Sequence, residues 1–358
     1  MKSYRIGAIG GDGIGPEVVR EGLRILRHVA DREGFEVQVD EFPFSAEHFL
    51  KTQVTLPPDF LETARGYDAL LLGAIGDPRL EIGMLERAVI SGLRFGLDLY
   101  VNLRPVRLYA EHLTPLKDKG PKDIDFIVVR ENTEDVYAGI GGIFKKGTPD
   151  EVAIQEMIFT RRGTERVIRY AFDLARRRGG RKKLTLVDKA NAVRAMDLWT
   201  RTFEEVGAEY PDVERDHAYV DAAAMYMIRH PEWFDVIVVS NMFGDILTDL
   251  GAMLTGGLGI AASGNIHPGQ VSLFEPVHGS APKFAGKGVA SPIATILSVG
   301  MLLDHVGEAK AAARLEDAVA GLLRSGKIRS LATDSGTSTA QFGDMVLEAL
   351  ESPSKAHT

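Results

Sequence analysis

The sequence predicts an α/β fold, and two observations carry this prediction. Short apolar runs typical of buried strands alternate with helical patterns over most of the 358 residues, which is the order of an α/β architecture. Four predicted strands also end in or near reactive polar residues: Arg130, Lys189, Asp221 and Asn241. Ligands of open α/β sheets bind beyond the carboxyl ends of the strands, so these residues are candidates for a functional site.

Length and composition narrow the class of protein. At 358 residues the chain is longer than a single core usually grows, so we expect one large domain or two closely packed domains. The net charge of -8 argues against a nucleic-acid partner or an anionic membrane surface. The absence of cysteine excludes disulfides, thiolate nucleophiles and zinc–thiolate sites. The longest apolar run, 293–303, is too short to span a bilayer, and no signal-peptide pattern occurs in 1–15, so we expect a cytoplasmic protein.

The N-terminal region begins with a strand, a glycine loop and a helix. The strand covers 4–9, the loop covers 10–15, and Pro16 suits the first turn of a helix that continues to about residue 32. This loop is not a Rossmann fingerprint, because the third glycine of G-x-G-x-x-G, counted from Gly11, falls at Pro16. Further strands are predicted at 35–39 and 69–72, followed by a helix at 84–97.

The strand–helix alternation is interrupted in the middle of the chain. A strand at 125–130, a loop at 139–142 and a second strand at 151–160 follow one another with no clear helix between them. This pattern predicts a protruding hairpin-like arm, which is a place for subunit contact. The remaining predictions are a helix at 164–178, strands at 183–187 and 216–220, a glycine-rich segment at 256–264, a loop at 275–282, and helices at 291–305, 308–325 and 338–350.

The stretch 234–250 carries the pattern around which we organise the site. A buried strand at 236–240 precedes a helical pattern that opens at Gly244, and Asp245 and Asp249 lie one turn apart on one face of that helix. Their carboxylates repel each other unless a cation lies between them, and a hard divalent ion such as Mg2+ or Mn2+ takes such ligands. Acidic residues in a first helical turn are also favoured by the helix dipole alone.

Several basic residues suit an anionic substrate. If Arg94, Arg104 and Arg130 converge, their guanidinium groups can bind two carboxylates, although a single arginine more often forms a surface ion pair. Lys189 follows a buried strand, and a lysine partly desolvated near other cations exchanges protons readily; the alternative is an ion-paired lysine. Tyr137, in the loop after Arg130, is suited to hand on a proton or simply to pack.

Six motifs occur in order along nearly the whole chain. They are Gly11–Glu17, Leu93–Arg94 with Asn102–Pro105, Val129–Glu134 with Tyr137, Asp188–Asn191, Asn241–Asp249 and Phe274–Ala281. Together they resemble the β-decarboxylating dehydrogenases, which include isopropylmalate, isocitrate, homoisocitrate and tartrate/D-malate dehydrogenases. The resemblance implies a two-domain, isopropylmalate dehydrogenase-like fold with a shared non-Rossmann sheet. Residues 1–99 with 256–358 would form the cofactor-binding domain. Residues 100–255 would bind substrate and metal and dimerise, with an arm near 131–160.

The resemblance also implies roles for individual residues. Ile90, Arg94, Arg104, Arg130 and Asp221 would bind a small dicarboxylate substrate, and Tyr137 and Lys189 would transfer protons. Asp221, Asp245 and Asp249 would hold Mg2+ or Mn2+, with Lys189 and Asp221 supplied by the partner subunit of a homodimer. Glu275, His278, Gly279, Ser280, Ala281, Lys283 and Ser291 would line the dinucleotide. NAD is the expected dinucleotide. NADP is the alternative, because Lys283 stands where NAD-using members carry aspartate.

The implied reaction is the oxidative decarboxylation of a 3-substituted D-malate. Apolar Ile90, where similar isopropylmalate enzymes keep a leucine, favours 3-isopropylmalate and therefore leucine biosynthesis. Ser91 and Ala192 depart from the family pattern, so D-malate and tartrate are alternative substrates. Arg87 lies on the same helix face as Arg94 and could pair with an added carboxylate, so isocitrate and homoisocitrate are further alternatives. A non-catalytic regulatory subunit is the alternative from a different class, and the presence of the proton-transfer and metal-binding residues speaks against it.

Overall fold

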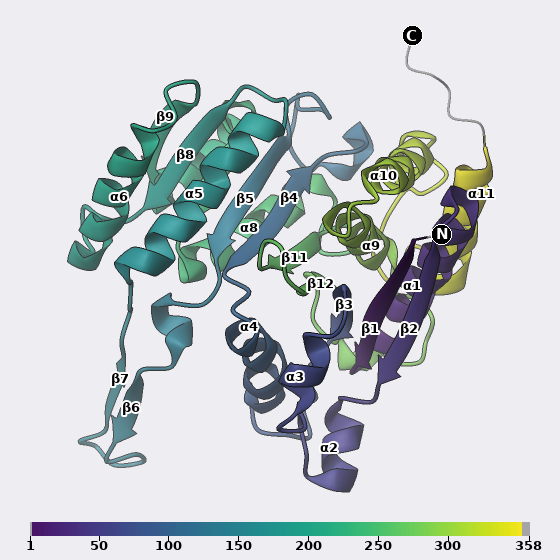
Figure 1. Ribbon diagram of the computed structural model, residues 1–358, viewed down its shortest axis with the longest axis horizontal. Coiled ribbons are helices and arrows are strands. Elements are labelled where there is room, and N and C mark those ends of the chain that lie inside the picture. The colour runs from purple at the N-terminus through teal and green to yellow at the C-terminus, as the bar shows by residue number, and fades with distance from the viewer. Residues whose placement is uncertain (1, 353–358) are drawn as a thin grey trace. The chain divides into compact units, whose positions relative to one another are not determined.

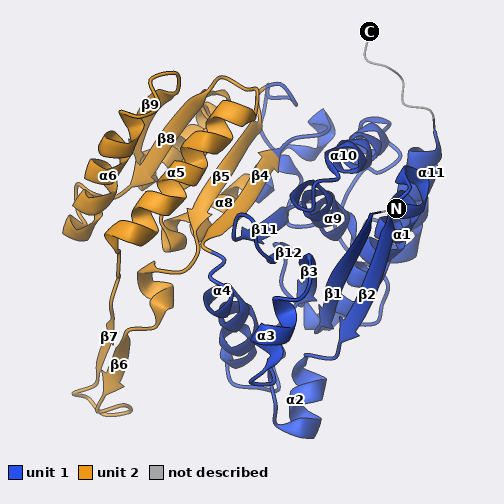
Figure 2. Cartoon of the chain, in the orientation of Figure 1, with its two compact units in different colours: residues 1–99, 107–122, 252–358 blue, residues 100–106, 123–251 orange. Residues whose placement is uncertain are grey.

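The structure is a computed structural model that describes residues 2–352 (Figure 1). Two compact units make up the chain, and Figure 2 distinguishes them by colour. The first unit comprises the described parts of 1–99, 107–122 and 252–358, and the second comprises 100–106 and 123–251. Strands and helices alternate along most of both units, so the predicted α/β class is confirmed. Within residues 2–352, no helix is long and apolar enough to cross a membrane.

The strands of the first unit follow the order β2-β1-β3-β12-β11. They are β1 (Ser3–Gly11), β2 (Glu36–Phe42), β3 (Ala69–Ala74), β11 (Ala262–Ile266) and β12 (Ser272–Pro276). The pairs β1/β2, β1/β3 and β3/β12 are parallel, whereas β11 runs antiparallel to β12. All of β3 is buried, as expected for a strand covered on both faces. β11 and β12 form a hairpin that overlaps the end of the predicted glycine-rich segment (256–264) and the start of the predicted loop (275–282), and the sequence analysis missed both strands.

Helices cover both faces of these strands. They are α1 (Gly15–Glu33), α2 (Ala46–Thr52), α3 (Phe60–Ala64), α4 (Gly92–Gly96), α9 (Ile293–His305), α10 (Ala309–Arg324) and α11 (Thr339–Glu351). Alternate residues of β3 enter two different cores. Leu71 packs with residues of α1, α9, α10 and α11, whereas Leu72 packs with Val89 and Leu93 near α4. The period of two places one core on each side of the sheet.

The predicted helix boundaries hold at α1 and, to within one residue, at 84–97, but the second helix is not α-helical throughout. Pro16 lies in the first turn of α1, and Gly34 ends it with a left-handed φ of 79°. Between Glu86 and Ser91 the chain forms a π-helix, and α4 at Gly92–Gly96 continues it as an α-helix. A π-helix has a wider turn than an α-helix, so the spacing of three or four residues no longer tells which side chains share a face.

Strand order in the second unit is β4-β5-β10-β8-β9. These strands are β4 (Val101–Arg107), β5 (Asp125–Glu131), β8 (Lys183–Asp188), β9 (Glu214–Tyr219) and β10 (Val236–Val239). The accompanying helices are α5 (Arg161–Arg177), α6 (Asp197–Gly207), α7 (Val220–Arg229) and α8 (Asn241–Thr255). Because β5, β10, β8 and β9 are parallel, their carboxyl ends meet at one edge. Helix α8 begins at Asn241, three residues before the predicted start at Gly244.

A hairpin of β6 (Gly141–Phe144) and β7 (Val152–Gln155) extends away from the other strands of the second unit (Figure 1). This hairpin is the predicted arm. Its strands differ from the predicted ones, because β6 begins inside the expected loop and β7 is shorter than 151–160. Every residue of both strands is exposed. Short helical turns complete the described chain: η2 (Glu111–Leu113), η3 (Asp135–Ala138), η4 (Arg194–Met196), η5 (Pro231–Trp233) and η6 (Pro282–Phe284).

The segment 107–122 lies in the first unit, whereas the sequence analysis placed it in the domain 100–255. Two side chains explain the difference. Arg107 Nη1 and the Tyr109 hydroxyl both donate to Glu316 Oε1 on α10, at 2.7 and 2.8 Å. The aromatic ring of Tyr109 also packs in the core of that unit. A sequence pattern does not reveal such contacts between distant segments.

Candidate active site

In the second unit, five of the predicted site residues form one cluster. The Asp245 carboxylate accepts hydrogen bonds from the Tyr137 hydroxyl, at 2.7 Å, and from Arg130 Nη1. Arg104 Nη2 lies 3.5 Å from Asp245 Oδ1, and Arg104 Nη1 lies 3.8 Å from Asp249 Oδ1. Two of the three arginines that were expected to converge, Arg104 and Arg130, therefore lie together within a single chain, and their contact with the two aspartates was not predicted. Cations beside the two carboxylates offset the repulsion that their spacing creates.

Arg130 is held deep in the unit, with 1% of its surface exposed. Its Nε and Nη2 both donate to Asn241 Oδ1, at 2.9 and 2.7 Å, and its guanidinium carbon lies 5.3 Å from the centre of the Tyr137 ring. A Cβ atom on Gly244 would come within 2.6 Å of Arg130 Cγ. The helix must carry glycine there so that the arginine can pass beside it.

The two aspartates of α8 fit a hard divalent cation. Their carboxylates project from one helix face, are partly exposed, and offer only oxygen donors, which is the donor set of Mg2+ and Mn2+. Partial burial raises the pKa of Asp249, and the neighbouring Asp245 carboxylate adds to that rise against the opposing Arg104 charge. Such mutual repulsion is what a bound cation relieves. No group of three or more potential ligands occurs within residues 2–352 of this one chain.

Lys189 and Asp221 form a second cluster. Lys189 follows β8, Asp221 lies in the first turn of α7, and Lys189 Nζ donates to Asp221 Oδ1 at 2.6 Å. The ammonium group lowers the pKa of the Asp221 carboxyl. Both residues were predicted as contributions to a partner subunit's site, and the structure brings them together within one chain.

Glu131, at the end of β5, is a buried acid beside the cluster that the sequence analysis did not select. Its Oε1 accepts from the backbone N–H and the hydroxyl of Thr133, both at 2.7 Å, and its Oε2 accepts from the Glu134 N–H at 2.9 Å. Burial raises the pKa of Glu131 to about 7 against these hydrogen bonds, which favour the ionised form. The acid thus fixes the start of the loop that carries Tyr137.

Arg94 and Glu275 meet in the first unit. Arg94 Nη2 donates to Glu275 Oε1 at 3.0 Å, and Asn265 Nδ2 donates to the same oxygen at 2.8 Å. A predicted substrate-binding residue therefore contacts a predicted cofactor-binding residue. Ile90 packs partly into the core below α4. Arg87 does not follow the α-helical expectation, because its guanidinium group donates to the Ile82 carbonyl and lies 3.7 Å from Glu81, with the side chain 65% exposed.

The segment after β12 contains the predicted dinucleotide residues. His278 Nε2 is buried and has no hydrogen-bond partner within residues 2–352, while burial lowers the pKa of the ring. Gly279 is exposed, Ser280 is buried, and Ala281 has a left-handed φ of 41°, a strained conformation that clusters at functional sites. An orphaned nitrogen on a strained loop fits a ligand with polar groups.

Two other predicted dinucleotide residues have different surroundings. Lys283 is exposed, and its Nζ lies 4.8 Å from the centre of the Phe284 ring. The Ser291 hydroxyl donates to the Gly259 carbonyl at 3.4 Å and accepts the Ile293 N–H at 3.3 Å at the start of α9. Ser291 therefore serves the helix terminus in this structure, and its contact with a cofactor stays a prediction.

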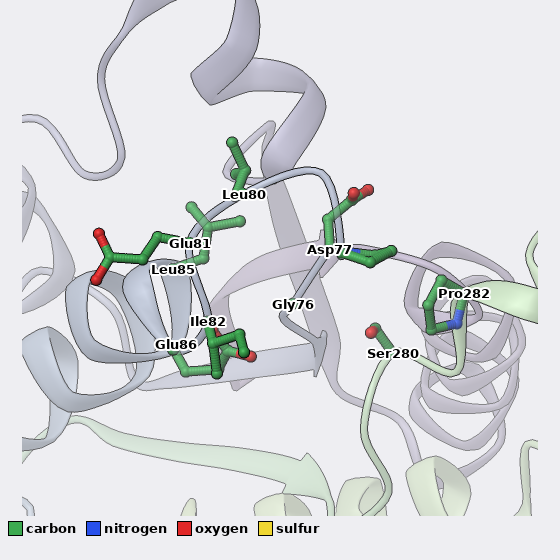
Figure 3. Close-up of a pocket in the computed structure, with 11 residues that line it drawn as sticks. Gly76, Asp77, Leu80, Glu81, Ile82, Leu85, Glu86, Ser280 and Pro282 are labelled. Carbon is green, nitrogen blue, oxygen red and sulfur yellow. The ribbon is translucent and has the colours of Figure 1, made fainter. Parts of the chain in front are cut away.

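A pocket of about 410 Å³ lies beside Ser280 in the first unit. Its wall consists of Ser280 and Pro282 from the loop after β12 and of the segment from Gly76 to Glu86 (Figure 3). This volume falls in the range of small-molecule sites. Asp12, from the glycine loop, stabilises the pocket: its carboxylate accepts the Gly76 N–H at 2.9 Å and the Ala46 N–H at 2.7 Å.

Sequence reasoning missed Asp12, Glu131 and the pocket segment. The signals were present but weak. Asp12 stands between two glycines, and Gly76–Pro78 follows a buried strand. In any α/β sheet, residues that follow a strand are candidates for ligand binding. The three-dimensional structure is needed to distinguish them from residues of ordinary turns.

Three comparisons with known proteins show what this chain is similar to. A family model described as isocitrate/isopropylmalate dehydrogenase matches residues 5–346. The 3-isopropylmalate dehydrogenase of Thermobifida fusca is 51% identical over 97% of this chain and 98% of its own, and that of Frankia casuarinae is 53% identical over 95% and 97%. The isocitrate dehydrogenase structure from Methylococcus capsulatus superposes with a TM-score of 0.87 at 40% identity, over 98% of this chain and 100% of its own.

The buried acid Glu131 predicts a pH-dependent stability. A pKa of about 7 in the folded state, against 4.5 as the ordinary value, means that the folded chain holds its proton more tightly than the unfolded chain. The stability linked to that proton is present below pH 4.5 and is lost as the pH rises through 7. We compare the free energy of unfolding of E131Q with that of wild type. The value for E131Q minus the value for wild type should increase by about 2.5 kcal/mol as the pH rises from 5 to 8. Urea titrations of both proteins at pH 5 and pH 8 measure this change.

Proposed function

Because this chain belongs to the isocitrate/isopropylmalate dehydrogenase family, we propose that it oxidises and decarboxylates a 3-substituted D-malate. The proposed substrate is 3-isopropylmalate and the product 4-methyl-2-oxopentanoate, a step of leucine biosynthesis. The observation that carries this proposal is the cluster of Arg104, Arg130, Tyr137 and Asp245 in one unit. Relatives named for the same substrate share about half of the residues over nearly the full length.

Arginine side chains bind the two malate carboxylates in this proposal. Arg104 and Arg130 are buried at the aspartate cluster, where low solvent exposure strengthens their attraction for an anion. Arg94 is the third proposed ligand, and its present bond to Glu275 keeps a buried guanidinium group paired. An overall acidic protein thus offers a local cationic site to an acidic substrate.

Proton transfer falls to one lysine and one tyrosine. Lys189 of the partner subunit takes the proton of the C2 hydroxyl as the C2 hydride leaves. After CO2 departs from the β-carboxylate, Tyr137 supplies the proton that C3 needs. The Tyr137 hydroxyl already lies 2.7 Å from an aspartate of the proposed metal site, which supports its place at the reacting atoms.

Asp245 and Asp249, with Asp221 of the partner subunit, would hold Mg2+ or Mn2+. A divalent ion bound there supplies a Lewis acid that polarises the oxygen on C2 and stabilises the negative charge left by decarboxylation. Residues Glu275, His278, Gly279, Ser280 and Ala281 would hold the dinucleotide beside the pocket of Figure 3, with NAD as the proposed hydride acceptor. Lys283 and Ser291 are further proposed contacts of the dinucleotide.

The arm is the proposed contact with a second copy of the chain. Its exposed side chains include Ile143, Phe144 and Ile154, with exposed fractions of 54, 66 and 53%. Removing adjacent apolar side chains from water is favourable, and a two-stranded hairpin cannot bury them by itself. A matching hairpin of a second copy would cover them. Helices α7 and α8 expose Met225, at 63%, and Ile246, at 61%, which supports a dimer contact on the same unit.

The orientation of Arg87 bears on the substrate. Its guanidinium group contacts Glu81 and the Ile82 carbonyl, so it is occupied within its own loop. This arrangement favours the apolar side group of isopropylmalate over the third carboxylate of isocitrate or homoisocitrate. Ser91 leaves D-malate and tartrate as the competing substrates.

The substrate proposal predicts a ranking of initial rates. With Mg2+ and NAD, 3-isopropylmalate should give a kcat/KM above those for D-malate, tartrate, D-isocitrate and homoisocitrate, and NADP should be the poorer acceptor. NADH absorbance in a substrate-by-cofactor panel measures this. A higher kcat/KM for D-malate would reassign the substrate, and no rate with any of them would favour a regulatory subunit. As a control, K189M should lose turnover while its melting temperature changes little.

The dimer proposal predicts that charge on the arm separates the subunits. I143D combined with I154D should convert the protein from dimer to monomer, because two carboxylates would have to be buried without partners. Sedimentation velocity measures the mass, and activity should fall with it because Lys189 and Asp221 act across the interface. The control T148D, on the exposed loop between the strands, should stay dimeric. A monomeric wild type with full activity would contradict the proposal.

A further inference from the structure

Asp135 has an uncommon combination of backbone and burial. Its φ of 69° lies in the left-handed region that favours glycine, yet the residue is aspartate and none of its surface is exposed. A non-glycine residue in this region costs of order 1 kcal/mol unless its surroundings hold it there. A buried carboxylate also needs hydrogen-bond donors. Both conditions point to a specific role for the side chain.

The Asp135 carboxylate joins two segments that are far apart in the sequence. Its Oδ1 accepts the N–H of Val136 at 2.8 Å, inside η3, and its Oδ2 accepts the N–H of Met242 at 3.0 Å, in the first turn of α8. The first N–H groups of a helix lack partners within the helix, and a carboxylate there is favoured by the helix dipole. Asp135 thus caps α8 from another part of the chain.

A second contact reinforces the same junction. Asn241, the first residue of α8, donates from Nδ2 to the Glu134 carbonyl at 3.2 Å while its Oδ1 accepts two N–H groups of Arg130. Glu134 and Asp135 are neighbours, so the loop and the helix are joined by side chains from both directions. The two segments therefore hold a fixed spacing.

That spacing determines where two functional groups meet. Tyr137 lies two residues after Asp135 on the loop, and Asp245 lies three residues after Met242 on the helix. Their side chains meet in the 2.7 Å hydrogen bond between the Tyr137 hydroxyl and Asp245 Oδ2. We infer that Asp135 is a positioning residue that sets Tyr137 against Asp245. The inference depends on the proposed function, in which Tyr137 protonates C3 and Asp245 binds the metal.

Two substitutions of Asp135 distinguish the effect of its carboxylate from the effect of its backbone conformation. Glycine and asparagine both tolerate the left-handed φ, but only asparagine keeps an oxygen that can cap α8. D135G should therefore lower kcat by about 100-fold with a smaller change in KM, since a displacement of about 1 Å of a reacting group has that effect. D135N should recover at least a tenth of the wild-type kcat. D118G is the matched control, because the exposed Asp118 has a similar φ of 59°.

Pre-steady-state kinetics identify the step that slows. Hydride transfer precedes the protonation of C3, so D135G should give a burst of NADH in the first turnover and a slow steady state afterwards. Y137F should show the same burst. Hydrogen exchange of the free protein gives a readout without substrate: in D135G the amides of 242–245 should exchange faster together with those of 135–138, and in D118G neither segment should change.

The outcomes distinguish this inference from the proposed function. Faster exchange confined to 135–138, or a D135G enzyme with wild-type kcat, would overturn the positioning role. Equal loss of activity in D135N and D135G would also overturn it, because the cap would then not explain the effect. If the wild type has no activity on any substrate of the panel, the proposed function fails, whereas coupled exchange of the two segments would still show the junction.

Discussion

A fully buried guanidinium group imposes the main constraint on the second unit. The charge of Arg130 is removed from water, and an unpaired charge in such a position is strongly destabilising. Asn241 and Asp245 pair with it, so α8 must begin near the end of β10 and present these residues toward β5. Gly244 must lack a side chain for the same reason. Asn241, Gly244 and Asp245 are thus the residues that one buried arginine requires of the neighbouring helix.

The same constraint connects stability with the proposed chemistry. Asp245 neutralises Arg130 and accepts from Tyr137, so the proposed metal-binding aspartate lies beside the residues proposed to bind substrate and to deliver a proton. A substrate carboxylate would replace Asp245 as a partner of the arginine, and the aspartate would then face a cation. An exchange of partners of this kind keeps every buried charge paired throughout binding.

The sequence allowed much of the fold and the kinds of site residue to be predicted, but not their connections. Buried parallel strands such as Ala69–Ala74 and Val236–Val239 are continuous apolar runs, and both were found. The hairpin of β11 and β12 was missed because glycine and proline dominate its surroundings. The π-helix at Glu86–Ser91 was missed because it shares the apolar spacing of an α-helix. Arg130 was chosen with two other arginines and Asp245 was chosen with Asp249, but the sequence did not connect the two groups. The contacts of Asn241 and Asp135 arise only where β5, η3 and α8 meet.

The glycine loop at 10–15 shows how a motif acquires meaning from the fold. Its failure to match a Rossmann fingerprint left it without a role in the sequence, yet in the structure it supports the pocket in two ways. A Cβ on Gly13 would lie 1.8 Å from the Ser280 carbonyl oxygen, and the Ile14 N–H donates to that oxygen at 2.9 Å, so the loop holds the segment after β12 by close backbone contact. Asp12 binds the opposite wall at Gly76. In this unit the glycines serve the approach of one loop to another. The N–H groups of Asp12, Ile14 and Gly15 donate to carbonyl groups of the chain at 2.7 to 2.9 Å, so the glycine segment supports the loops that line the pocket.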